Sequence, residues 1–165
     1  MSLAYSKPFA KKAHKGQKRW GGEDYYETHL LGALKVFITQ YTTLSSDPIT
    51  TADAVVLHDT IEDTNVTYED LVAKFGSDVA IIVYIVSKKE GEEYYDFIKR
   101  IIDSKNPEAI LVKLSDIGHN LQNLKKGAMK DKYKLARALL MKSLKEMTEV
   151  NMDFGIPNET DITWQ

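Results

Sequence analysis

The sequence contains no cysteine among its 165 residues. Disulfide bonds, thiolate nucleophiles and cysteine-ligated zinc are therefore excluded. It also lacks any apolar run close to the roughly 20 residues that a membrane-spanning helix needs. Its first residues lead straight into lysines, without the apolar core of a secretory signal. We therefore expect a protein that makes no contact with a membrane and, because nothing directs it elsewhere, a cytoplasmic one.

The net charge is also small, because the sequence has 22 Lys and Arg residues and 24 Asp and Glu residues. The two signs are nevertheless segregated. Residues 1–22 include six basic side chains and no acidic one, whereas residues 36–73 include seven acidic side chains and no Lys or Arg. This distribution suits a phosphorylated ligand that meets a cation-binding centre. Two ordinary solvated faces would explain it equally well.

Helix signals dominate the sequence, and the alternation typical of strands is scarce. The predicted helices cover about 5–17, 26–41, 47–61, 67–74, 78–87, 92–104, 106–116 and 130–150. The run 78–87 is rich in Ile and Val, which favour strands, but its helical surroundings favour a buried helix. We expect residues 1–150 to form a single all-α domain. Residues 151–165 have few large apolar side chains and are expected to form a loosely held C-terminal tail.

The most informative polar cluster is the segment 58–64, HDTIEDT. On a helix, His58 lies one turn from Glu62, and Asp59 lies one turn from Asp63. Three carboxylates within five residues repel one another unless a cation or a basic ligand compensates them. A metal centre is therefore one interpretation of the segment. A solvated acidic helix end with a satisfied histidine is the other.

Two further side chains could complete a metal centre. His29 lies near the beginning of the second predicted helix, and Asp116 lies where the apolar helix from residue 106 is expected to end. Together with His58 and Asp59 they provide two imidazoles and two carboxylates, which suit Mn²⁺, Fe²⁺ or Zn²⁺. Taken singly, His29 could be a histidine with one backbone contact, and Asp116 an ordinary carboxylate at a helix end.

Five short motifs occur in the order and at the separations of a known family. They are AHKGQKR at 13–19, YxxH at 26–29, HDxxEDT at 58–64, FG with VA at 75–80, and VKLxDxxHN at 112–120. They resemble the signatures of the HD-superfamily (p)ppGpp hydrolase domain of RelA/SpoT-type proteins over about residues 5–142. We expect no synthetase, TGS or ACT region, because 165 residues leave no room for one beside this domain. We therefore expect the closer likeness to be to the stand-alone small alarmone hydrolases.

The resemblance implies an HD-type helical bundle around one Mn²⁺. It also implies hydrolysis of the 3′-pyrophosphate of (p)ppGpp, which gives GDP or GTP and pyrophosphate. The residues that match the metal ligands are His29, His58, Asp59 and Asp116. Glu62 and Asp63 match the catalytic pair that activates and positions the attacking water.

The resemblance also implies contacts with the nucleotide. Arg19 matches the arginine that packs against the guanine base, and Asn120 matches the asparagine near the ribose. The expected phosphate or base contacts are Lys15, Lys18 and Lys113.

The chain departs from the family pattern at the expected nucleoside pocket. Ile117-Gly118 replaces the usual Arg-Leu, and Asn123 stands where a threonine often approaches the guanine. A hydrolase acting on another nucleotide, such as NADPH or a nucleoside monophosphate, is therefore a second interpretation. A non-catalytic nucleotide sensor is a third. No nucleic-acid partner is expected, because the basic clusters are short and the chain is slightly acidic.

Overall fold

The structure is a computed structural model that describes residues 3–124 and 126–153. Within these residues it consists of helices and connecting loops, with one isolated backbone bridge between Lys18 and Asp24. The helices are α1 (Leu3–Ala13), η1 (Tyr26–Leu30), α2 (Leu31–Val36), η2 (Phe37–Tyr41), η3 (Thr42–Leu44), α3 (Pro48–Leu57), α4 (Thr60–Asp63), α5 (Tyr68–Phe75), α6 (Ser77–Val86), α7 (Tyr94–Asp103), α8 (Pro107–Asn123) and α9 (Ala128–Asp153). The predicted all-α fold is confirmed.

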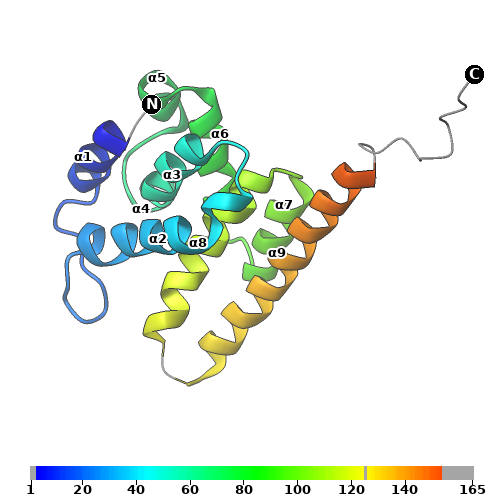
Figure 1. Cartoon of the computed structure of the whole chain (residues 1–165). Coiled ribbons are helices and arrows are strands. Elements are labelled where there is room, and N and C mark those ends of the chain that lie inside the picture. The colour runs from blue at the N-terminus through cyan, green and yellow to red at the C-terminus, as the bar shows by residue number, and fades with distance from the viewer. Residues whose placement is uncertain (1–2, 125, 154–165) are drawn as a thin grey trace, which may run out of the picture.

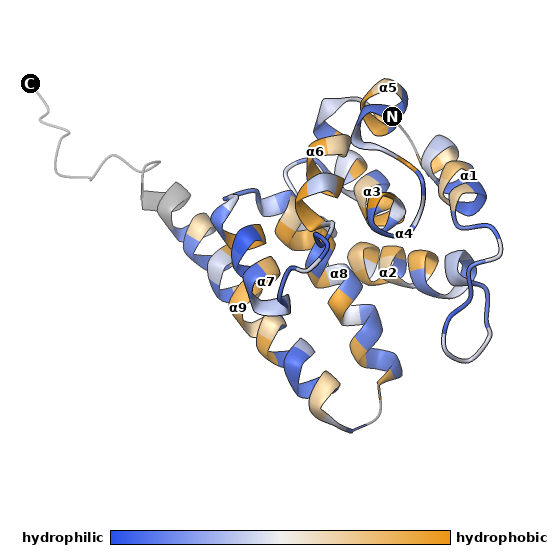
Figure 2. Cartoon of the chain, turned by 180° about the vertical axis from the view of Figure 1, so that it is seen from behind, coloured by the Kyte–Doolittle hydropathy of each residue, from blue (hydrophilic) through white to orange (hydrophobic). Residues whose placement is uncertain are grey.

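Helix α3 lies at the centre of the bundle and packs against α1, α2, α6 and α8. Helix α9 packs along α8 and α7 on the side away from α1 (Figure 1). Hydrophobic residues are concentrated on α2, α3 and α6 (Figure 2). The core therefore surrounds α3, and residues at the end of this helix are well placed to emerge into a buried site.

Local signals in the sequence explain where several helices begin. The side chain of Asp47 accepts a hydrogen bond from the Thr50 backbone at the start of α3. Thr67 and Asp70 form a reciprocal capping box at the start of α5. The apolar run predicted as a helix at 78–87 forms α6, which buries one face and leaves Ile81 and Tyr84 exposed on the other. No helix in the described part of the chain is both long and apolar enough to cross a membrane.

The predicted end of α8 near Asp116 is wrong, because the helix continues to Asn123. The next two residues suit the interior of the bundle. The Ile117 side chain is fully buried, and Gly118 lies so close to α2 that an added Cβ would come within 2.9 Å of Val36 Cγ1. Gly118 thus marks a close helix contact, and Asp116 projects from the middle of a helix.

The last helix also differs from its predicted range. It begins at Ala128 and extends to Asp153, which includes the first three residues of the predicted C-terminal tail. The remainder of that tail, residues 154–165, lies outside the described residues.

Candidate active site

Four side chains from three parts of the fold converge near the end of α3. His29 lies on η1, a π-helical turn of the kind often found at functional sites. His58 and Asp59 follow α3 directly, and Asp116 projects from α8. The Nε2 atom of His29 lies 3.3 Å from His58 Nε2, 3.4 Å from Asp59 Oδ2 and 3.3 Å from Asp116 Oδ1. The structure thus brings all four predicted metal ligands together.

Neighbouring groups fix the orientation of both imidazoles. His58 Nδ1 lies 2.7 Å from the Val55 carbonyl oxygen, so Nδ1 donates and Nε2 faces the cluster. His29 Nδ1 lies 3.0 Å from His119 Nδ1. Burial, with the nearby charges of His29 and Arg19, lowers the pKa of His119 to about 4. The neutral ring has one acceptor nitrogen, which serves either His29 at Nδ1 or the Asn123 amide, 3.3 Å from Nε2.

The ring of His119 fits because the residue opposite it is Gly32. A Cβ added at Gly32 would lie 2.2 Å from His119 Nε2. Any larger residue there would displace the ring that orients His29.

The two carboxylates of the cluster are also held by hydrogen bonds. The Tyr25 hydroxyl donates to Asp59 Oδ2 at 2.6 Å. Asp116 accepts from Lys113 Nζ at 2.6 Å on Oδ2 and from Asn120 Nδ2 at 2.7 Å on Oδ1. Lys113 and Asp116 are both buried, so each compensates the charge of the other.

The charges of the cluster shift the pKa values of its members. Burial alone would lower the pKa of His58, but the charges of Asp59 and Asp116 outweigh it and raise that pKa to about 9. Burial alone would raise the pKa of Asp116, but Lys113 and the imidazoles hold it below its usual range. The carboxylates therefore remain ionised, and the imidazoles take up protons when no cation balances them.

The facing atoms of the four clustered side chains fit a divalent metal ion. Two imidazole nitrogens and two carboxylate oxygens face one another, and those of His29, His58 and Asp59 all lie within 4.8 Å of one another. Atoms that carry lone pairs repel at such separations unless protons or a cation lie between them. The mixed nitrogen and oxygen set, with no sulfur ligand, suits a borderline or hard divalent ion.

Glu62 and Asp63, on the single-turn helix α4, lie at the exposed rim of this cluster. Glu62 Oε2 accepts a hydrogen bond from the Lys88 backbone N–H at 2.8 Å. Asp63 Oδ2 accepts one from Gln17 Nε2 at 2.9 Å. Partial burial raises the pKa of Glu62 above its ordinary value, which brings this carboxylate closer to the range of a general base.

A cavity of about 330 Å³ connects the cluster with the rim. We call it the metal cavity. Its lining includes Asp59, Asp116, Glu62, Asp63, Asn120, Tyr94, Tyr133, Lys88, Lys113 and Lys132. Three lysines and four carboxylate side chains thus line this cavity. A divalent ion would change the lining from net negative to net positive, which favours a phosphorylated substrate.

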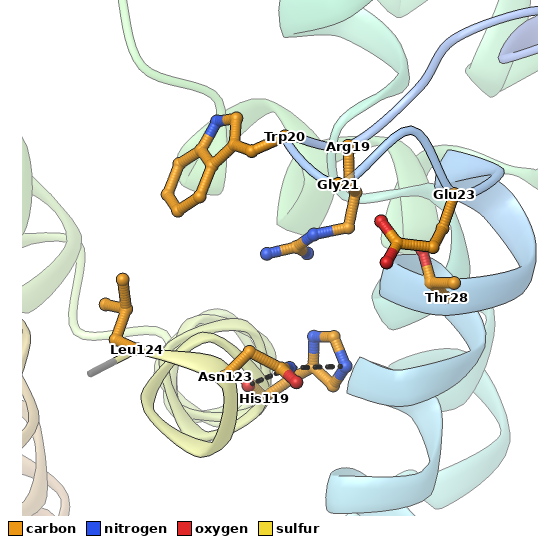
Figure 3. A pocket seen from close by; sticks show the side chains of 8 residues that line it. All are labelled: Arg19, Trp20, Gly21, Glu23, Thr28, His119, Asn123 and Leu124. Carbon is orange, nitrogen blue, oxygen red and sulfur yellow. Dashed lines mark hydrogen bonds between the residues drawn. The ribbon is translucent and has the colours of Figure 1, made fainter.

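A second cavity, of about 420 Å³, is lined by Arg19 and His119 among others, and we call it the base cavity. Figure 3 shows Arg19 and Trp20, from the loop after α1, opposite His119, Asn123 and Leu124. Arg19 donates a hydrogen bond of 3.0 Å to Asn120 Oδ1, and Asn120 in turn bonds Asp116. A short polar chain therefore connects the base cavity with the metal cluster.

Not every predicted substrate contact lies in these two cavities. Lys15 is exposed and lines a third cavity, beside Gln17 and Asp63, while Lys18 is exposed in the loop before η1 and lines none of the cavities described. Of the departures from the family pattern, Asn123 lines the base cavity, whereas Ile117 and Gly118 line neither.

Sequence reasoning gave no role to four residues that contact or surround the cluster. Tyr25 is four residues before His29, and His119 is three residues after Asp116, so helical spacing from a ligand could have identified both. Lys88 and Lys132 come from the α6–α7 loop and α9, and no short-range signal connects them with the motifs.

Among known proteins, those similar to this chain include (p)ppGpp 3′-pyrophosphohydrolases. No protein-family model matches the chain. It is 38% identical over 124 residues to a guanosine-3′,5′-bis(diphosphate) 3′-pyrophosphohydrolase of Aquifex aeolicus, which covers 70% of this chain and 17% of that protein. The corresponding protein of Vibrio cholerae is 35% identical over 150 residues, or 84% of this chain and 20% of that protein. The chain therefore spans about a fifth of the length of these relatives.

A solved structure gives an independent comparison of the fold. It is that of a metazoan ortholog of SpoT described as hydrolysing ppGpp, and the match covers 95% of this chain and 98% of that one. The TM-score is 0.68 and the sequence identity 21%, so this likeness establishes the fold alone. The chain has the HD-type helical bundle. Its sequence is related to one segment of the (p)ppGpp 3′-pyrophosphohydrolases, which confirms the resemblance drawn from its motifs.

Proposed function

We propose that this chain is a metal-dependent hydrolase that removes the 3′-pyrophosphate of (p)ppGpp and yields GDP or GTP and pyrophosphate. The observation that carries the proposal is the convergence of His29, His58, Asp59 and Asp116 beside the two rim carboxylates. The similarity to proteins of this name supports the choice of substrate.

His29, His58, Asp59 and Asp116 are the proposed ligands of one divalent ion, and Mn²⁺ is the proposed ion, with Fe²⁺ or Zn²⁺ as alternatives. When bound, such an ion acidifies water and polarises a phosphoryl oxygen. Val55 and His119 hold the two imidazoles in the orientation that ligation requires.

Glu62 and Asp63 are the proposed catalytic pair. Each has one oxygen engaged in a hydrogen bond at the rim and lines the metal cavity. A carboxylate so placed can accept the proton of an attacking water as the oxygen–phosphorus bond forms. No side chain needs to act as a covalent nucleophile.

The remaining charged groups of the metal cavity are proposed to bind the phosphates. Lys113 is fixed by Asp116, and Lys88 and Lys132, from two other elements, also line the cavity. Their ammonium groups offset the negative charge that accumulates on the departing pyrophosphate.

The nucleoside is proposed to bind in the base cavity. Arg19 supplies a flat cationic surface for a purine ring there. Asn120, which bonds both Arg19 and Asp116, lies where the sugar would connect the base with the 3′-phosphates. The cytoplasmic location inferred from the sequence stays a prediction.

The test is incubation of the purified protein and Mn²⁺ with ppGpp, NADPH and GMP, with pyrophosphate and orthophosphate measured separately. We expect pyrophosphate and GDP from ppGpp, and no product when EDTA is present. Release of orthophosphate from NADPH or GMP would support the second interpretation. Nucleotide binding without turnover would support the sensor.

A further inference from the structure

His14, which the proposed mechanism does not use, is buried, and its side chain makes a single hydrogen bond within residues 3–124 and 126–153. Only 2% of its surface is exposed, and its ring stacks on Tyr25 at 5.3 Å with an interplanar angle of 27°. Its Nδ1 lies 2.6 Å from Gln17 Oε1. Among the described residues its buried Nε2 has no hydrogen-bond partner.

The position of Asp63 determines which way the Gln17 amide points. An ionised carboxylate only accepts hydrogen bonds, so the amide nitrogen of Gln17 must face Asp63 Oδ2, at 2.9 Å. The amide oxygen then faces His14, and His14 Nδ1 must carry the proton that it donates. The lone pair remains on Nε2, the nitrogen without a partner.

The three side chains therefore form a directed chain of donors from His14 through Gln17 to Asp63. The buried ring is fixed by its stacking on Tyr25, so it in turn fixes the amide. Gln17 holds Oδ2 of Asp63, and the other oxygen of that carboxylate is left for the reaction. The Lys88 backbone N–H holds Glu62 in a corresponding way.

We infer that Gln17, oriented by His14, is a positioning residue for Asp63; this inference rests on the proposed function. Within the described part of the chain, the Gln17 side chain bonds His14 and Asp63 and none of the proposed metal ligands. It acts by setting the rotamer of a catalytic carboxylate.

The test uses Gln17→Glu, which preserves size and can still accept from His14 but places two carboxylates face to face. We expect kcat to fall about 10- to 100-fold, because small misplacements of reacting groups cost rates of this order. KM and the binding of Mn²⁺ should stay within about twofold of wild type, since neither ligands nor cavity cations change. Gln40→Glu, which adds the same charge at an exposed position, is the matched control. An unchanged kcat in Gln17→Glu would overturn the inference.

A double-mutant cycle tests the role of His14. His14→Phe keeps a flat ring against Tyr25 but cannot donate, so the Gln17 amide becomes free to turn. We expect a loss of kcat in this variant and no further loss in His14→Phe/Gln17→Ala beyond that of Gln17→Ala alone. Additive losses would show that His14 acts independently of Gln17 and would contradict the proposed chain.

One measurement does not depend on turnover. ¹⁵N NMR of the imidazole should show the His14 proton on Nδ1 in the wild type, and a proton on Nε2 would overturn the geometry. If the wild type fails to release pyrophosphate from ppGpp, the proposed function fails by that result. If the wild type is active and Gln17→Glu is equally active, only the positioning role fails.

Discussion

The buried metal cluster and the rim carboxylates differ in how firmly the fold holds them. His29, His58 and Asp116 are at most 5% exposed, and each is oriented by groups from the helices around it. Glu62 and Asp63 are exposed, and each accepts one hydrogen bond from a loop. The cluster is therefore part of the core, whereas the rim depends on the loops that reach it.

This difference separates two requirements of the proposed chemistry. A cation needs ligands fixed to within a fraction of an ångström, which packed helices provide. A proton acceptor must also meet a substrate that enters and leaves, so it lies where loops can adjust. Changes in the core should thus remove the metal, while changes at the rim should remove the reaction and leave the metal bound.

The largest effect is expected from His58→Ala. This change removes an imidazole that is buried, fixed to Val55 and directed at the cluster. We expect loss of bound metal together with a fall in pyrophosphate release of at least about 10³-fold, because the proposed Lewis acid is lost. Metal content after dialysis and the turnover rate measure the two effects. Full metal occupancy in this variant would show that the ligand assignment is wrong.

A smaller effect is expected from Asp63→Asn at the rim. The carboxamide can still accept from Gln17 but cannot take up a proton, so we expect kcat to fall about 10²- to 10⁴-fold while metal content stays at the wild-type level. Asp96→Asn, at an exposed position in the first turn of α7, serves as the control. Wild-type turnover in Asp63→Asn would remove this residue from the mechanism.

The contrast between core and rim also explains what the sequence could predict. His58 and Asp59 follow directly after a helix that is buried along most of its length, so their emergence from the core could be predicted from the order of residues. The helical spacing of polar groups after an apolar run is a local property. The fold class and the convergence of the four proposed ligands could therefore be predicted from the sequence.

Contacts between the loops and α4 could not be predicted in this way. Gln17 meets Asp63 across 46 positions, and Lys88 meets Glu62 across 26, so no local pattern connects either pair. The end of α8 could not be predicted for a related reason, because Gly118 lies at a contact between two helices. A glycine near a helix end often stops the helix, but here it permits the close approach of α8 to Val36.

The smallest effect is expected from a change at Glu92, which helps to hold the loop between α6 and α7 at the rim. Arg100 donates to the carbonyl oxygens of Ile85 and Ser87 and to both carboxylate oxygens of Glu92, which holds the loop that presents Lys88 to Glu62. Glu92→Gln should cost about 1–2 kcal/mol at pH 7, because a charge-assisted pair becomes a neutral one. It should also lower kcat less than Asp63→Asn does. Thermal or urea unfolding measures the cost, and Glu93→Gln, an exposed neighbour, is the control.

The loss of unfolding free energy in Glu92→Gln should depend on pH in a definite direction. The hydrogen bonds from Arg100 lower the pKa of Glu92 from 4.5 to about 2. A carboxylate whose pKa is lower in the folded state contributes its full stability above its unfolded pKa and loses it as the pH falls through the folded value. The difference in unfolding free energy between wild type and Glu92→Gln should therefore be constant near neutral pH and shrink between about pH 4.5 and pH 2. A difference that persists unchanged at pH 2 would show that the loop is held by packing and not by the ion pair.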